Sequence, residues 1–180
     1  MKNILSIAIA LTIFNINILA QELVIGEERV NPGIVFVFEG AVKDHIMPRS
    51  MHLKENQTNV HLEARVNWDK NNIPEGTPKG GFIPYLHITA RVTNQTKGLS
   101  TFIDLLPHIN LIDNFHYARN ISLPGSVDDL YSVEFNIAPP TQIDLALHMD
   151  WLENYGDSLM KEYNFYYSNI NFEVIANAKR

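Results

Sequence analysis

Alternation of apolar and polar residues is the feature that most limits the folds open to this chain. Val60–Trp68 places an apolar residue at every second position, and residues 83–93 and Leu130–Ala138 largely repeat the pattern. A period of two predicts β-strands with one buried face and one polar face. Residues 33–39 are more uniformly apolar and residues 163–175 are rich in aromatic side chains, so both are also predicted to be strands.

Turn-forming residues separate the predicted strands. Residues 69–81 are rich in Asn, Pro, Gly and Lys, and residues 94–98 form a short polar turn. Pro139 and Pro140 end the strand before them, because proline cannot donate to a sheet ladder. One short helical turn within residues 152–162 is the most that we expect of helix. The pattern predicts an all-β fold, an immunoglobulin-like β-sandwich of about seven to nine antiparallel strands forming one domain over residues 21–180.

The first 20 residues have the organisation of a secretory signal peptide. Lys2 gives the positive start, residues 4–14 form an apolar run too short to span a bilayer, and Ala20 precedes the expected cleavage at Gln21. The mature chain would have 160 residues (180 − 20) and, having lost Lys2, a net charge of −7 (−6 − 1). We therefore expect a periplasmic or secreted protein that does not span the membrane.

The chain has seven histidines and no cysteine. Disulfides, thiolate zinc sites, iron–sulfur clusters and blue-copper centres are thereby excluded, and a metal site must use His, Met, Asp or Glu. The acidic net charge argues against binding to nucleic acid, which requires a basic surface. No hydrolase or phosphate-binding motif is present.

His61 and Glu63 form the first candidate site. Two residues apart on a strand, they project from the same face, about 6.7 Å apart along the backbone. Both could bind one metal ion, or Glu63 could orient the imidazole. The alternative is a pair of polar residues on a solvated strand face.

His108 and His116 form the second candidate site, eight residues apart (116 − 108). The segment between them, which contains Asp113, is predicted to be a loop that folds back and brings the two imidazoles to one point. His148, in the sequence His148-Met149-Asp150, is a third candidate. The alternative for all three histidines is an unrelated position in a surface loop.

Residues 44–52 form a fourth cluster that mixes thioether and imidazole groups: His45, Met47, Met51 and His52. Such a set suits copper, particularly Cu(I). The alternative is an irregular connection whose methionines fill gaps in the packing. His87 is interpreted as a surface residue.

Taken in order, several short motifs resemble the periplasmic iron-transport protein family. They are HLEA from His61, GGFIPYLHI from Gly80, HYARNI from His116, APP from Ala138 and HMD from His148. The resemblance runs from about residue 33 to residue 174. It implies an immunoglobulin-like, copper-binding, usually dimeric protein that accompanies an inner-membrane iron permease.

The resemblance also implies a copper site. The family's ligand positions fall on His61, Glu63, His116 and His148, while its Met-Pro-Met turn reads Leu106-Pro107-His108 here. His108 would then replace a methionine, although an alignment without a gap selects Ile109, which cannot bind metal. A site without sulfur favours Cu(II) over Cu(I) and also accepts Zn(II).

We therefore expect an accessory protein that assists oxidation or handover of ferrous iron. The alternatives are a zinc or copper storage protein without a redox role, and a sandwich domain used only for protein contacts. Glu63, Asp113 and Asp150 are candidate oxygen ligands for iron. A possible second metal site would use four residues, His45, Met47, Met51 and Asp113.

Overall fold

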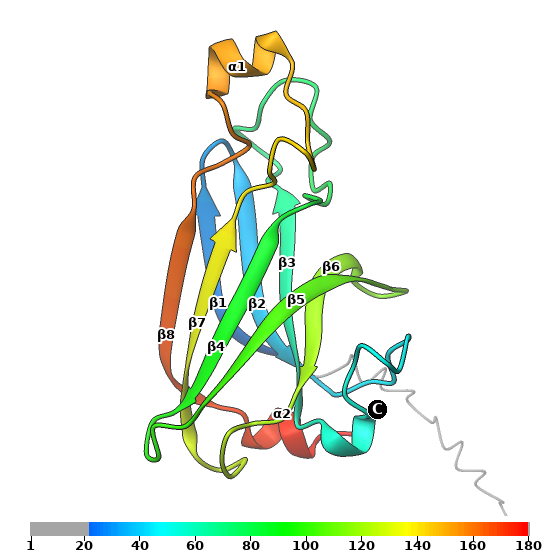
Figure 1. The fold of residues 1–180 in the computed structure, drawn as a ribbon, viewed down its shortest axis with the longest axis vertical. Coiled ribbons are helices and arrows are strands. Elements are labelled where there is room, and N and C mark those ends of the chain that lie inside the picture. The colour runs from blue at the N-terminus through cyan, green and yellow to red at the C-terminus, as the bar shows by residue number, and fades with distance from the viewer. Residues whose placement is uncertain (1–21, 180) are drawn as a thin grey trace, which may run out of the picture.

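The structure is a computed structural model that describes residues 22–179, so the expected signal peptide lies outside the described residues. Eight antiparallel strands and little helix make up the fold, which confirms the predicted all-β class (Figure 1). The strands are β1 (Glu22–Val30), β2 (Ile34–Ala41), β3 (Val60–Trp68), β4 (His87–Asn94), β5 (Ser100–Asn110), β6 (Asn114–Ile121), β7 (Leu130–Ala138) and β8 (Tyr163–Asn171). The helices are α1 (Met149–Tyr155), α2 (Glu173–Asn177) and the 3-10 turn η1 (Glu55–Gln57).

The strands follow the order β1-β2-β3-β6-β5-β4-β7-β8. The long strand β5 joins the two halves of this arrangement, because Ser100–Leu105 pairs with β4 and residues 106–110 pair with β6. The outer strands β1 and β8 approach each other, and the Tyr167 hydroxyl donates a hydrogen bond of 3.0 Å to Glu28. The sheet is therefore nearly closed around its core.

Aromatic side chains fill the space between the two halves. Phe38 on β2 stacks on Phe135 of β7 with ring centroids 4.1 Å apart, and both rings are fully buried. The buried Tyr117 of β6 donates a hydrogen bond of 2.8 Å to the carbonyl of Ile83 and accepts one of 3.0 Å from the Leu86 amide. These bonds fix the segment before β4 against β6.

Three predicted elements have other bounds in the structure. The strand expected over residues 83–93 starts only at His87, because Tyr85 has a left-handed φ of 65° and Ile83–Leu86 leave the ladder. The strand expected over residues 163–175 ends at Asn171, whose side chain accepts a hydrogen bond from the Glu173 amide and starts α2. The helix near residue 152 begins earlier, at Met149. In the described part of the chain, no helix is long and apolar enough to cross a bilayer.

The segment between residues 108 and 116 is not the predicted loop but the tip of a hairpin. β5 and β6 run antiparallel from His108 and His116 to a tight turn in which Asn114 adopts a φ of 62°. The hairpin projects from the sheet in Figure 1, beside the segment of residues 42–59. Together they cover the start of β3, so that the first five residues of β3 are buried on both faces.

Candidate metal centre

Three histidines from three neighbouring strands meet at one point. His61 lies on β3, His108 on β5 and His116 on β6, and their candidate ligand nitrogens all lie within 4.8 Å of one another. His108 is directly opposite His116 in the β5–β6 register, and their ring centroids are 5.8 Å apart. The ring of His61 lies 5.3 Å from that of His108. The spacing is close enough for one metal ion to contact all three rings, so the cluster is a candidate metal centre.

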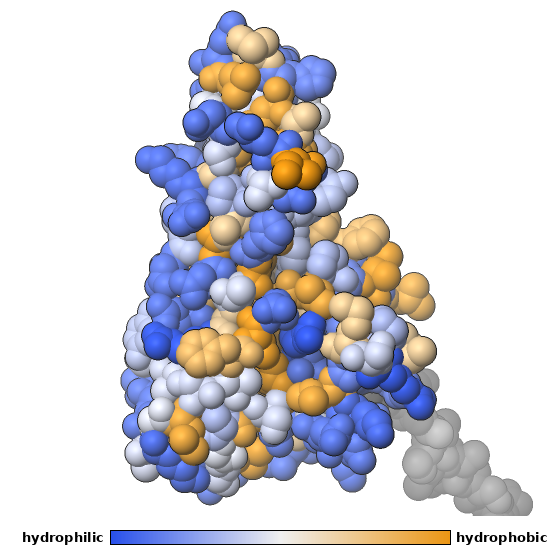
Figure 2. Space-filling model, in the orientation of Figure 1, coloured by the Kyte–Doolittle hydropathy of each residue, from blue (hydrophilic) through white to orange (hydrophobic). Residues whose placement is uncertain are grey.

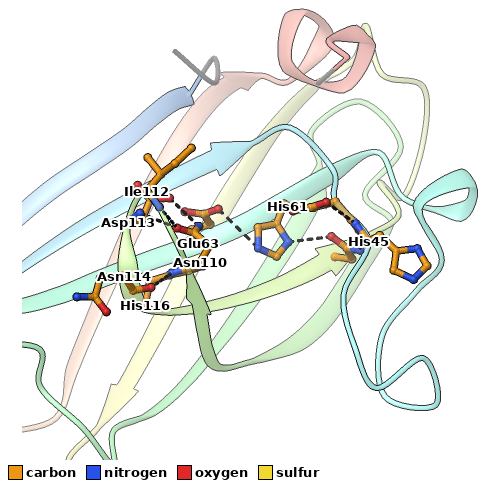
Figure 3. Close-up of polar contacts among 10 residues, drawn as sticks. His45, His61, Glu63, Asn110, Ile112, Asp113, Asn114 and His116 are labelled. Carbon is orange, nitrogen blue, oxygen red and sulfur yellow. Dashed lines mark hydrogen bonds and ion pairs between the residues drawn. The ribbon is translucent and has the colours of Figure 1, made fainter. Parts of the chain in front are cut away.

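Asn120 sets the tautomer of His61. The Asn120 amide nitrogen donates to the carbonyls of Asp44, at 2.8 Å, and Leu53, at 3.1 Å. Its oxygen must then face His61 Nδ1, which lies 2.8 Å away and carries the proton. The lone pair of His61 is therefore on Nε2, which faces a Glu63 oxygen at 3.6 Å (Figure 3).

His116 is oriented by the hairpin turn. Its Nδ1 lies 3.1 Å from the carbonyl oxygen of Asn114 and donates to it, so Nε2 carries the lone pair. The side chain is only 1% exposed, and burial holds its pKa below the usual value. The imidazole is consequently neutral at pH 7, the form that binds metal.

His108 lies among the other imidazoles, and both its ring nitrogens are buried without a hydrogen-bond partner among the described residues. Burial, reinforced by the neighbouring His61, His52 and His116, lowers the pKa of His108 to about 3. A buried polar atom without a partner costs about 1–3 kcal/mol. A metal ion would satisfy one of these nitrogens, so the donor set fits a bound cation.

Glu63 adds a carboxylate to the imidazoles. Its side chain is 2% exposed, and in the described part of the chain one of its oxygens has no hydrogen-bond partner. Burial, followed by the nearby charges of Asp113, Glu39 and Glu22, raises the pKa of Glu63 to about 8. The carboxyl group therefore keeps its proton at neutral pH until a cation replaces it.

The centre opens into a cavity of about 680 Å³. Its lining includes His61, His108 and His116, together with Met47 and Met51 from the segment of residues 42–59. Both methionines are exposed, and the three clustered ligands are all imidazoles. A neutral imidazole set with one carboxylate suits Cu(II) and Zn(II) better than Cu(I).

His148 is not brought to this cluster within one chain. It is exposed at the start of α1, whose Trp151 packs against Trp68 with ring centroids 6.3 Å apart. Trp68 and His61 are seven residues apart on β3, roughly 23 Å in an extended strand. Figure 1 shows α1 at the upper end of the molecule, away from the β5–β6 hairpin.

The other candidates lie in two places. Asp113 lies in the hairpin turn, bonded to the Asn110 amide at 2.8 Å and close to Glu63 (Figure 3). The structure thus separates Asp113 from Met47 and His45 of the possible second site. His45 is exposed and accepts a hydrogen bond of 3.2 Å from Arg49, with its ring turned away from His61 in Figure 3.

The hairpin register distinguishes the two candidate ligand positions on β5, His108 and Ile109. His108 faces the other histidines, whereas the next residue, Ile109, is 65% exposed on the opposite face.

Sequence reasoning missed Asn120, whose only signal was its place in the HYARNI motif. It also assigned His52 to a separate cluster, although its ring lies 5.0 Å from that of His108.

Comparison with known proteins identifies relatives of this chain. The family described as Fe2+ transport protein matches residues 19–173. The 34 kDa membrane antigen of Treponema pallidum (strain Nichols) is 29% identical over 132 residues, which are 72% of this chain but only 63% of that relative's length. A UPF0423 protein of Brucella abortus (strain 2308) is 25% identical over 155 residues, and the match covers 83% of each chain.

Solved structures share the fold. A copper-bound variant of the Campylobacter jejuni P19 protein has a TM-score of 0.69 and 25% identity, covering 83% of this chain and 96% of P19. A copper-bound variant of FetP from uropathogenic Escherichia coli strain F11 has a TM-score of 0.68 and 24% identity, covering 82% of this chain and 95% of FetP.

Proposed function

The chain belongs to the Fe2+ transport protein family, and we propose that it is a periplasmic copper-binding accessory protein of high-affinity iron uptake. In this role it assists oxidation or handover of ferrous iron to an inner-membrane permease. The copper-bound structures of P19, a relative of similar fold, support copper as the metal.

One observation carries the proposal: the ligand nitrogens of His61, His108 and His116 lie within 4.8 Å of one another, and those of His108 have no hydrogen-bond partner within residues 22–179. A purely structural core would not leave such nitrogens buried and unpaired, because apolar side chains would pack there at lower cost. The proposed ligands are these three histidines and Glu63.

Cu(II) is the favoured ion because the clustered ligands contain no sulfur. When bound, copper would supply a one-electron couple that ferrous iron can reduce. His61 and His116 would bind the ion through Nε2. Asn120 and the Asn114 carbonyl hold the two rings in the tautomer that leaves the lone pair on this atom. Glu63 contributes a carboxylate ligand, because a bound cation favours the ionised form and releases the proton that burial retains.

Iron enters as substrate. Asp113 lies close to Glu63 at the hairpin turn, so these two carboxyl groups are the proposed oxygen ligands beside the copper. Asp150 lies in α1, at the other end of the molecule, and does not join them within one chain. The net charge of −7 expected for the mature chain would attract cations.

A homodimer is part of the proposal. The β5–β6 hairpin carries three strongly exposed apolar side chains, Ile109, Leu111 and Ile112, and Figure 2 shows apolar atoms gathered on this side of the molecule. Exposed apolar patches of this kind mark interaction surfaces. We propose that a second copy covers this hairpin, and that its His148 reaches the centre as an additional ligand.

The experiment is a redox assay on the purified mature protein. Cu(II) is added first, then ferrous iron, under exclusion of air, and the formation of Cu(I) and ferric iron is followed by absorbance and EPR. The proposal predicts that ferrous iron reduces the bound copper. Copper that stays oxidised would instead favour the alternative, a copper or zinc storage or transfer protein, which the all-imidazole set also suits.

A further inference from the structure

His52, in the segment of residues 42–59, lies against the three clustered histidines. The ring centroid of His52 is 5.0 Å from that of His108, with the ring planes at 75°. His108 in turn contacts His61 and His116. Four imidazole rings therefore form one contiguous group, and all four residues line the same cavity.

His52 and His108 both carry buried ring nitrogens that have no hydrogen-bond partner among the described residues. Nδ1 of His52 is buried without a hydrogen-bond partner among the described residues, as are both ring nitrogens of His108. Two adjacent rings thus carry three such nitrogens. Burying each of them without a partner destabilises the folded chain. A metal ion that accepts one lone pair from each ring would satisfy two of these three nitrogens, one on His52 and one on His108.

His52 is also held in place. The segment that carries it is fixed to β6 by the Asn120 amide, which donates to the carbonyls of Asp44 and Leu53. Leu53 directly follows His52, so the anchor lies one residue away from the imidazole. The same Asn120 orients His61 through its oxygen. One side chain therefore positions two of the four rings.

We propose that His52 is a ligand of the metal ion, so that a single chain presents four imidazoles, His52, His61, His108 and His116. The inference rests on the proposed metal centre and adds a ligand to it. The class of ion is a borderline divalent cation, Cu(II) or Zn(II). Binding would fasten residues 42–59 over the cavity, and tight binding would not require a second copy of the chain.

The test compares His52→Ala with His45→Ala. His45 is the matched control, because it lies in the same segment but is exposed and bonded to Arg49. The Cu(II) dissociation constant is measured by competition with a chelator, and the bound nitrogens are counted from their hyperfine splitting in the EPR spectrum. We expect His52→Ala to weaken binding at least about tenfold and to lose one nitrogen, with His45→Ala unchanged. Wild-type values for His52→Ala on both measurements would overturn the inference.

A second measurement uses the unmodified protein, in case His52→Ala does not fold. With ¹⁵N-labelled histidine, addition of Zn(II) is expected to shift the ring nitrogens of His52 together with those of His61, His108 and His116. The exposed His87 should not shift. If the three strand histidines shift and His52 does not, the inference is wrong while the metal centre stands. If no histidine shifts, both are wrong.

Discussion

Nδ1 of His61 lies 2.8 Å from the side-chain oxygen of Asn120, whose amide nitrogen holds two carbonyls of the segment covering the site. A ligand histidine and the cover of its cavity thus depend on one amide. Partners of this kind fix the ring and its tautomer, and their loss weakens metal binding.

Asn120→Ala should therefore weaken Cu(II) affinity by about 10–100-fold. It should also lower the free energy of unfolding by about 1–3 kcal/mol, because buried polar groups lose their partners. Chelator competition and urea unfolding measure the two effects. Asn164→Ala removes an exposed amide that bonds to Glu134 and Asn136 of β7, so it is the control for affinity and should leave Cu(II) binding unchanged. Equal affinity of Asn120→Ala and wild type would refute this role.

His108→Met tests the effect of a missing thioether. Because sulfur stabilises Cu(I), the substitution should raise the Cu(II)/Cu(I) reduction potential, and the wild-type protein should hold Cu(II) in air. Redox titration followed by EPR gives both results. Ile109→Met, whose side chain would lie on the exposed face, should leave the potential unchanged. Stable Cu(I) in the aerated wild-type protein would contradict the account.

Glu63 predicts a pH dependence of stability in the metal-free protein. Its pKa rises from an ordinary value of 4.5 to about 8 on folding, so between these values the folded chain holds a proton that the unfolded chain has lost. The unfolding free energy of the wild type, relative to that of Glu63→Gln, should therefore fall as the pH rises from about 4.5 to 8. The upper bound of this fall is about 5 kcal/mol.

Urea unfolding of both proteins at several pH values measures this difference. Subtracting Glu63→Gln removes the opposite contribution of His108, whose pKa of about 3 makes the folded state more stable as pH rises toward 6.5. A difference that is independent of pH would mean that Glu63 is not protonated in the folded protein.

His148→Ala tests the proposed second copy. His148 is exposed and far from the cluster in its own chain, so its removal should leave the unfolding free energy unchanged. In the dimer it should weaken Cu(II) affinity, and by less than the loss of a strand histidine. Sedimentation fixes the oligomeric state at each concentration used. An unchanged affinity in a proven dimer would exclude His148 from the site.

The alternation of apolar and polar residues predicted the observed first and last residues of two strands. β3 and β7 have the predicted bounds. On each strand, the apolar residues at alternate positions are buried in the core. β1 was not predicted, since it is an edge strand that carries several charges. β5 and β6 were missed because their outer halves form a projecting hairpin. There, apolar residues such as Ile109 face solvent, which obscures the alternation of buried apolar and exposed polar residues.

The site was predictable only in part. His61 and Glu63 share a strand face, which a period of two reveals directly. The approach of His108 to His116 depends on the hairpin register, and that of His52 depends on where a long irregular segment folds. Neither has a periodic signal in the sequence. The roles of Asn120 and Asn114 are also invisible there, because they arise from hydrogen bonds between distant or turn residues.

The most direct test of the central claim is the Cu(II) dissociation constant of His116→Ala. His116 is buried, holds a fixed tautomer and lies in the three-histidine cluster. The account predicts that this substitution abolishes tight binding while the circular dichroism spectrum and the fold remain, and that His87→Ala, at an exposed site, binds like the wild type. An unchanged dissociation constant in folded His116→Ala would contradict the account.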